Sequence, residues 1–169
     1  MLKFKRIIAP TMIALLFALT SYAQRPMGRN FGFGLILGDP VGGTIKIWTA
    51  PDQAFTGMIA ASYFGAPRIG GDYIWHFDAF RSDVVKMYAG PGLHLGIGEG
   101  AYYIYRRNGD VFYVRDAGTA AVGVRVMLGI NIVPRDTPIE MFFEAGPLVG
   151  ITPAFGTALD LGIGIRFYP

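Results

Sequence analysis

The stretch ALDLGIGIRF, residues 158–167, alternates between two kinds of side chain. Every second residue from 159 to 167 is a large hydrophobic group, whereas most of the residues between them are small. Strict alternation of this kind predicts a β-strand with two unlike faces. The second row also includes Asp160 and Arg166, so this face carries opposite charges and little bulk.

The same alternation recurs along most of the chain, in stretches separated by turn signals that contain Pro, Gly or Asp. No stretch after residue 23 has the periodicity of an amphipathic helix. The pattern therefore predicts an all-β fold of about eight antiparallel strands, joined mainly by short turns. We expect the strands at residues 31–37, 43–49, 55–64, 68–78, 84–97, 118–132, 139–144 and 158–167.

Strands of this kind build a soluble sandwich, a lipocalin-like barrel or a membrane barrel, and the row of small and charged residues discriminates between them. In a soluble barrel that row meets water and is rich in polar side chains, whereas here it is mostly glycine, alanine and isolated charges. Small residues suit the narrow interior of an eight-stranded barrel. We therefore predict an eight-stranded antiparallel up-and-down transmembrane β-barrel, with a soluble barrel or sandwich as the alternative.

Aromatic residues near the strand ends favour the same interpretation, because aromatic side chains gather at both membrane interfaces of such barrels. Lipid then surrounds the hydrophobic row, and closure of the barrel pairs every backbone group within the sheet. The residues expected in the aromatic girdles are Phe31, Trp48, Tyr63, Trp75, Phe77 and Phe167.

The N-terminal segment has the pattern of an export signal. Three basic residues within the first six positions precede an apolar run at 7–19 and a small-residue cleavage motif at 21–23. The run is interrupted by a proline and is shorter than the roughly 20 residues that span a membrane. We expect a cleavable signal peptide over residues 1–23 and a single barrel domain over residues 24–169.

The net charge limits the possible partners, and the cysteine content limits the possible covalent modifications. The chain has 15 basic and 12 acidic residues, and the three basic residues of the expected signal peptide account for the net charge of +3. The mature chain would therefore have no net charge, which argues against a nucleic-acid partner. Cysteine is absent, so the exported chain has no disulfide and no cysteine to carry a lipid.

The small, charged row is expected to point into the lumen as an ion-pair network, because buried charges persist only when they are paired. A nearly symmetric last connection places Glu140 opposite Arg166. The same register places Glu144 opposite Asp160, with Arg125 as the nearest cation for this like-charge pair. Such a network is either a plug that stabilises the barrel or a gated path for small solutes or protons. Its expected members are Lys46, Asp72, Lys86, Arg125, Glu140, Glu144, Asp160 and Arg166.

Enzymatic chemistry is not supported by any local constellation. Folding the fourth strand onto the fifth places His76 near Lys86 and away from His94, so we expect no shared metal site. No Ser/His/acid triad is evident, and the glycine-rich runs lack the order of a phosphate-binding loop. We therefore expect no enzymatic activity, no cofactor, and no catalytic or metal-ligating residue.

One segment, YYIYRRNGDVFYV at 102–114, extends beyond this minimal design. It reads as a hairpin with a two-residue turn at 108–109, which places Tyr105 opposite Phe112. Its aromatic and basic side chains suit contact with lipopolysaccharide phosphates or a protein partner. The alternative is that two strands simply continue past the membrane. The candidate contact residues are Tyr103, Tyr105, Arg106, Arg107, Phe112 and Tyr113.

The end of the chain matches a known assembly signal: a polar residue, a glycine two positions later, and hydrophobic residues three and five positions after that glycine. Asp160, Gly162, Ile165 and Phe167 fit this pattern, and two further residues follow Phe167. With its strand pattern, the chain resembles the small bacterial outer-membrane β-barrels of the OmpA transmembrane-domain and OmpX type.

The resemblance implies an even number of strands, both termini in the periplasm, and alternate loops outside the cell. It also implies contact with outer-membrane lipid and lipopolysaccharide, and with the outer-membrane insertion machinery that reads the assembly signal. We expect a monomer in the bacterial outer membrane with a structural or surface-interaction role. A narrow, porin-like channel for small solutes is the second possibility, and a lipid-modifying outer-membrane enzyme is the third.

Overall fold

The computed structural model describes residues 25–104, 111–115, 119–153 and 155–169. In this part of the chain, a short 3-10 turn, η1 (Pro26–Gly28), precedes ten strands. No helix among the described residues is long and apolar enough to span a lipid bilayer. The strands are β1 (Phe31–Asp39), β2 (Val41–Trp48), β3 (Gln53–Ser62), β4 (Gly65–Phe77), β5 (Val85–Gly96), β6 (Gly100–Ile104), β7 (Val111–Arg115), β8 (Ala121–Ile132), β9 (Ile139–Thr152) and β10 (Gly156–Phe167).

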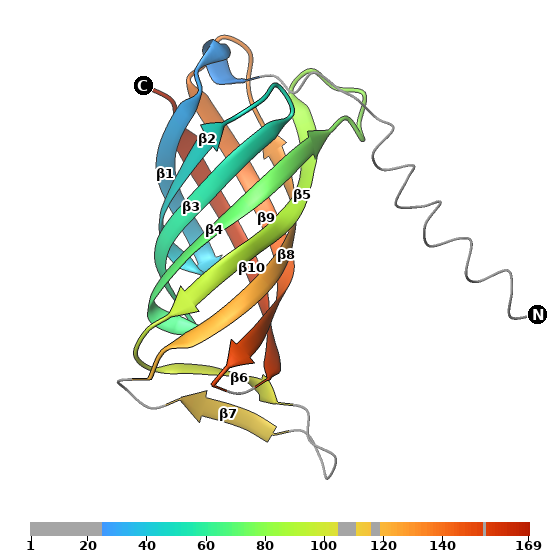
Figure 1. Ribbon diagram of the computed structural model, residues 1–169. Coiled ribbons are helices and arrows are strands. Elements are labelled where there is room, and N and C mark those ends of the chain that lie inside the picture. The colour runs from blue at the N-terminus through green and yellow to red at the C-terminus, as the bar shows by residue number, and fades with distance from the viewer. Residues whose placement is uncertain (1–24, 105–110, 116–118, 154) are drawn as a thin grey trace, which may run out of the picture.

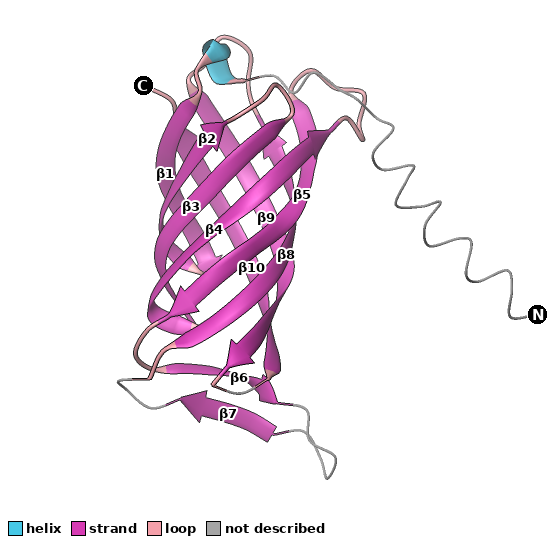
Figure 2. Cartoon of the chain, viewed as in Figure 1, coloured by secondary structure: helices cyan, strands magenta, loops and turns pink. Residues whose placement is uncertain are grey.

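Eight of these strands form a closed antiparallel barrel (Figure 1). Their order is β1-β2-β3-β4-β5-β8-β9-β10, and β10 pairs back onto β1. Within this set of eight, each strand lies beside the one before it and the one after it in the chain. Figure 2 shows that the wall consists of strands. The prediction of an all-β, eight-stranded antiparallel barrel is confirmed, and closure leaves no free edge in the wall.

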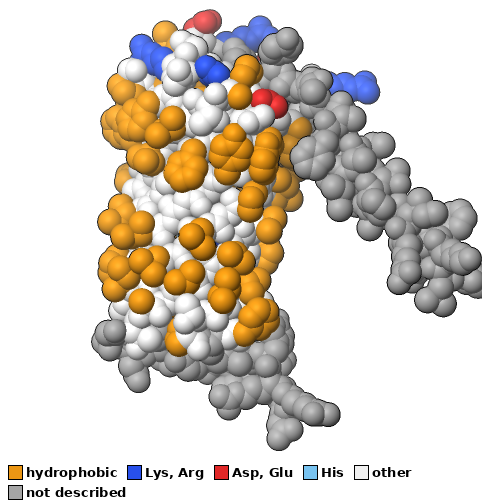
Figure 3. Space-filling view, viewed as in Figure 1, with side chains coloured by type: hydrophobic (Ala, Val, Ile, Leu, Met, Phe, Trp, Pro, Cys, Tyr) orange, Lys and Arg blue, Asp and Glu red, His pale blue; other side chains and the backbone are white. Residues whose placement is uncertain are grey.

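The two rows of each strand face opposite sides of the wall. Large hydrophobic side chains point outward and remain exposed on every side of the barrel, and Figure 3 shows them on one face. Leu35, Leu93 and Ile163 are each about 60% exposed, whereas the alternate residues beside them are buried or half-buried. The hydrophobic residues therefore cover the outside of the barrel rather than its interior.

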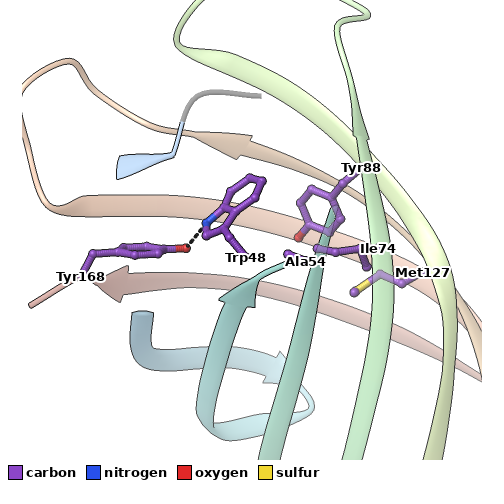
Figure 4. Packing of buried hydrophobic residues seen from close by; sticks show 6 residues of the cluster. All are labelled: Trp48, Ala54, Ile74, Tyr88, Met127 and Tyr168. Atoms are coloured by element: carbon purple, nitrogen blue, oxygen red, sulfur yellow. Dashed lines mark hydrogen bonds between the residues drawn. The ribbon is translucent and has the colours of Figure 1, made fainter. Parts of the chain in front are cut away.

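Two small hydrophobic clusters close the interior near its ends. One lies towards the end where β1 begins and β10 finishes, which we call the terminal end (Figure 4). The other lies towards the opposite end, which we call the hairpin end. The terminal cluster consists of Trp48, Ala54, Ile74, Tyr88, Met127 and Tyr168. The hairpin-end cluster consists of Phe64, Ala121 and Leu148, with Ala158 packed against it.

The terminal cluster corrects one expectation. Trp48 was expected in an exterior aromatic girdle, but it is only 4% exposed and lies inside the barrel. It shares the inward face of β2 with Thr44 and Lys46, since side chains two positions apart lie on the same face of a strand.

The long connection between β5 and β8 forms the β6–β7 hairpin at the hairpin end. β6 pairs with β10 through Tyr103 and Thr157. It also lies close to β4, which is four positions from β10 in the eight-stranded ring. The hairpin therefore lies across this mouth of the barrel and contacts opposite sides of it (Figure 1).

The register of this hairpin differs from the sequence prediction. Phe112 lies opposite Tyr103, not Tyr105, and the last pair within the described residues is Ile104 with Val111. The predicted register was wrong because a shift of two residues keeps every side chain on the same face, so alternation alone does not fix the register. The predicted turn at 108–109 lies outside the described residues. Tyr105, Arg106 and Arg107 lie outside the described residues.

Candidate functional site in the barrel interior

The interior between the two hydrophobic clusters is filled by polar and charged side chains. All eight residues expected in the lumen network are buried, and seven of them lie in this region; Lys86 was expected there but lies at the terminal end. Arg68, which was not assigned to the network, is also buried here. Arg68 had a signal, because it lies four positions before Asp72 and so falls on the same face of its strand. The buried polar residues are Thr44, Lys46, Thr56, Arg68, Asp72, His76, Lys86, His94, Arg125, Asn131, Glu140, Glu144, Asp160 and Arg166.

Glu140 is the centre of one group of contacts. Its Oε1 lies 2.9 Å from Lys46 Nζ and 3.3 Å from Arg166 Nη1, and its Oε2 accepts a hydrogen bond from the Tyr168 hydroxyl. Arg166 lies directly opposite Glu140 in the register, as the nearly symmetric connection predicted. The Arg166 guanidinium also lies 3.8 Å from the centre of the Phe142 ring. One carboxylate therefore compensates two buried cations.

A second group joins opposite sides of the barrel. Arg125 donates two hydrogen bonds to the Asp72 carboxylate, at 2.8 and 2.6 Å, and a third to Asp160 at 3.0 Å. Arg68 donates two hydrogen bonds to Asp160, at 2.9 and 2.5 Å. Because β4 and β10 are opposite each other in the ring, the Arg68–Asp160 pair crosses the lumen. Two-pronged bonds between arginine and carboxylate are among the strongest in proteins.

Glu144 lies between these two groups. Its Oε1 is 3.5 Å from Arg125 Nη1, and its Oε2 accepts a hydrogen bond of 3.3 Å from the Tyr88 hydroxyl. The direct Glu144–Asp160 pairing was wrong, since Glu144 lies opposite Gly162. Both carboxylates nonetheless contact Arg125, the cation expected beside them.

The charges of the two groups balance. Lys46, Arg68, Arg125 and Arg166 supply the cations, and Asp72, Glu140, Glu144 and Asp160 supply the anions. The balance holds with both interior histidines neutral, so the network needs no further ion to be compensated.

Lys86 lies apart from this network, at the terminal end. Its Nζ is 3.1 Å from Asp78 Oδ2, and the Asp78 side chain is 24% exposed. The hydrogen bond from Lys86 holds the pKa of the Asp78 carboxyl below its ordinary value. This pair therefore stabilises the connection between β4 and β5 rather than the lumen.

The two histidines have different partners and opposite proton positions. His76 Nε2 lies 2.9 Å from Lys46 Nζ and Nδ1 lies 3.2 Å from the Asp52 carbonyl oxygen, so Nδ1 carries the proton. His94 Nδ1 accepts from Arg68 Nε at 3.2 Å, so its Nε2 donates to Asp72. The expected contact of His76 with Lys86 was wrong, because the cross-strand partner of His76 is Tyr88.

Glycine on the inward face makes room for these large side chains. A Cβ at Gly70 would collide with the His94 ring, and one at Gly129 would collide with the Tyr88 ring. The same relation holds between Gly164 and Phe142. The small residues in the charged row therefore leave space for large side chains from the neighbouring strand.

The interior ion pairs join strands on opposite sides of the barrel. Among the described residues, no group of three or more His, Cys, Asp or Glu side chains is placed to hold a metal ion. The residues of the expected assembly signal lie along β10, with Asp160 buried and Phe167 exposed. No protein-family model, no curated protein and no solved structure matches this chain.

Proposed function

We propose that this chain is an integral outer-membrane β-barrel protein with a plugged polar lumen and a structural or surface-interaction role. One observation carries the proposal: the barrel exposes its large hydrophobic side chains and buries its charges. Water would penalise such an exterior at about 25 cal/mol for each Å² of apolar surface, whereas lipid would not. The outer row includes Leu35, Ile59, Leu93, Val126 and Ile163, which belong to five different strands.

The closed interior supports a structural role over transport. Arg68 and Asp160 meet across the lumen, and hydrophobic clusters lie on both sides of the charged residues. Each charge inside is compensated by a partner on another strand, so a passing solute would have to replace strong ion pairs. We therefore propose neither a channel nor an enzyme.

The β6–β7 hairpin supports the surface-interaction part of the proposal. It lies at the hairpin end, opposite the chain terminus at Pro169, and projects beyond the wall of the barrel (Figure 1). In the proposed orientation the termini face the periplasm and this hairpin faces outward, where lipopolysaccharide lies. The chain would reach this orientation through a cleaved signal peptide and the outer-membrane insertion machinery.

The test of the proposal uses the mature chain, residues 24–169, refolded into detergent. A closed, lipid-facing barrel should partition into detergent and migrate differently on a gel before and after heating. It should also float with liposomes in a density gradient. Recovery of the folded chain as a monomer in buffer without detergent would overturn the membrane proposal.

A further inference from the structure

The outer wall of the barrel carries an apolar groove of about 490 Å³ across β1 to β4. A volume of this size is within the range of sites that hold small molecules. Gly43 leaves backbone as the floor of the groove, whereas the Ile45 side chain packs over Gly57. Figure 3 shows hydrophobic side chains separated by areas without them on the outer wall. The sides of the groove are formed by Phe33, Ile45, Ile59 and Ile69.

The register sets the course of the groove. Gly43 lies opposite Ile59, and Gly57 lies opposite Ile45. Each glycine therefore has an isoleucine beside it on the neighbouring strand. Ile45 packs closely over Gly57, whereas Ile59 leaves space above Gly43. The result is a valley, not a flat patch.

The packing of the barrel does not require glycine at position 43. A Cβ there would find its nearest neighbour, an Ile59 methyl group, at 3.9 Å, which is ordinary contact. The inward glycines differ, since a Cβ at Gly129 would collide with a buried ring. The open floor at Gly43 is therefore unused space on the outside of the barrel.

The chemistry of the groove selects an apolar occupant. Thr44 is the one polar residue among those that line it, and its hydroxyl is turned inward. It donates to the Gly57 carbonyl oxygen at 3.2 Å and accepts from Arg166 at 3.0 Å. The groove thus offers no side-chain hydrogen bond to a headgroup or a polar ligand.

The size of the groove excludes a second protein chain. Ten residues line it, whereas a stable protein interface uses about 20–30 residues on each side. A single hydrocarbon chain fits both the size and the lining. The groove is also continuous with the exposed hydrophobic wall that we assign to lipid contact.

We propose that this groove binds one acyl chain of a membrane lipid as an ordered ligand. This inference rests on the proposed membrane location, because it needs lipid around the wall. Recognition comes from van der Waals contact along the hydrocarbon chain, because lipid around the wall supplies no hydrophobic driving force, and not from the headgroup.

The test is native mass spectrometry of the barrel purified in micelles that contain dipalmitoyl phosphatidylethanolamine. Gly43→Leu covers the floor and should lower the fraction of barrels that retain a lipid about tenfold, which corresponds to the loss of packing contacts worth about 1.4 kcal/mol. Ala145→Leu is the control, since it adds bulk to the outward face of β9, opposite β3 in the ring. Its lipid retention should match the wild type.

The lipid headgroup provides a second comparison. Dipalmitoyl phosphatidylglycerol should be retained as well as the ethanolamine lipid. Equal retention by wild type and Gly43→Leu, loss in Ala145→Leu as well, no retained lipid on the folded wild type, or dependence on the headgroup would each overturn the acyl-chain site.

Folding and membrane location are checked separately. Each variant must show the heat-dependent gel shift, and if Gly43→Leu does not, Gly43→Val replaces it with the same expected loss. A wild-type barrel that fails to float with liposomes contradicts the membrane proposal itself. A barrel that floats but binds no lipid in the groove contradicts only this inference.

Discussion

At the scale of single residues, the interior depends on charged groups that are shared by more than one partner. Glu140 contacts both Lys46 and Arg166, and Arg125 contacts three different carboxylates. Removal of a shared partner therefore leaves several groups uncompensated. The effect of a substitution should depend on which side of the pair is removed.

Glu140→Gln should be more damaging than Arg166→Met. The first leaves Lys46 and Arg166 buried without their anion, and breaking a buried ion pair costs about 3–5 kcal/mol. The second leaves Glu140 with Lys46 at 2.9 Å and with the Tyr168 hydroxyl, so its loss should be clearly smaller. Urea titration in micelles measures both, and equal losses would show that Glu140 is not the shared partner.

Substitution by alanine should lower the stability of the barrel at an inward glycine but not at an outward one. Gly129→Ala forces its methyl group into the Tyr88 ring, and overpacking of this kind costs about 1–3 kcal/mol. Gly43→Ala meets nothing nearer than 3.9 Å and should change the free energy of unfolding by less than about 0.5 kcal/mol. The same urea titration compares them, and a larger loss for Gly43→Ala would contradict the assignment of the two faces.

At the scale of elements, the end of β10 sends two adjacent aromatic residues to opposite sides of the wall. Phe167 is 43% exposed on the outside, whereas Tyr168 is fully buried. The Tyr168 hydroxyl contacts Glu140, and the Trp48 indole donates to it at 3.3 Å (Figure 4). The two residues are therefore expected to serve different steps, assembly and stability.

Phe167→Ser and Tyr168→Phe test this division. If the assembly signal ends at Phe167, its replacement should slow insertion into liposomes. Tyr168→Phe should insert at the wild-type rate but lose about 1–3 kcal/mol, because Glu140 loses a buried donor. Insertion is followed by the heat-dependent gel shift and stability by urea titration. Slower insertion of Tyr168→Phe than of Phe167→Ser would place the signal in a different register.

The connection between β4 and β5 should lose stability in acid. Its Asp78 has a pKa below the ordinary value of about 3.9 because Lys86 donates to it. The pair therefore stabilises the folded state fully above that ordinary value, and this contribution disappears as the pH falls through the lower folded pKa.

Asp78→Asn should accordingly be less stable than wild type near neutral pH and converge with it in strong acid. Urea titrations across this pH range in micelles measure the difference. Asp83→Asn is the control, because the Asp83–Arg135 pair is largely exposed and such pairs contribute little. A constant difference between Asp78→Asn and wild type at every pH would contradict the assignment.

At the scale of the whole molecule, the barrel is built with its hydrophobic surface outside and a compensated charged layer between two apolar clusters. The layer joins strands on opposite sides, as Arg68 and Asp160 show. Such ion pairs across the lumen contribute to the stability of the barrel wall. In the proposed function they also close the path through the lumen.

The wild-type barrel should therefore carry no steady single-channel current in a planar bilayer. The physical reason is that ions would have to displace the Arg68 and Arg125 ion pairs with Asp160. The heat-dependent gel shift of the same preparation verifies that the barrel is folded. Stable, reproducible conductance steps would refute the plug and favour a narrow channel.

The alternation of side chains along the chain was sufficient to predict the class of fold and the two faces of the wall. Alternation with a period of two assigns each residue to a face, and turn residues mark where strands end. The pairing of Glu140 with Arg166 was also predictable, because a short connection joins their strands and limits the register. Local geometry decides all of these features.

The contacts between inward charges on strands far apart in the chain could not be predicted, because they depend on the tertiary structure. Arg68 reaches Asp160, and Lys46 reaches Glu140 and His76, across strands far apart in the chain. The hairpin register was wrong for a related reason, since a two-residue slip leaves the faces unchanged. Periodicity determines the face of each side chain, but its partner across the lumen depends on closure of the ring, which no local pattern encodes.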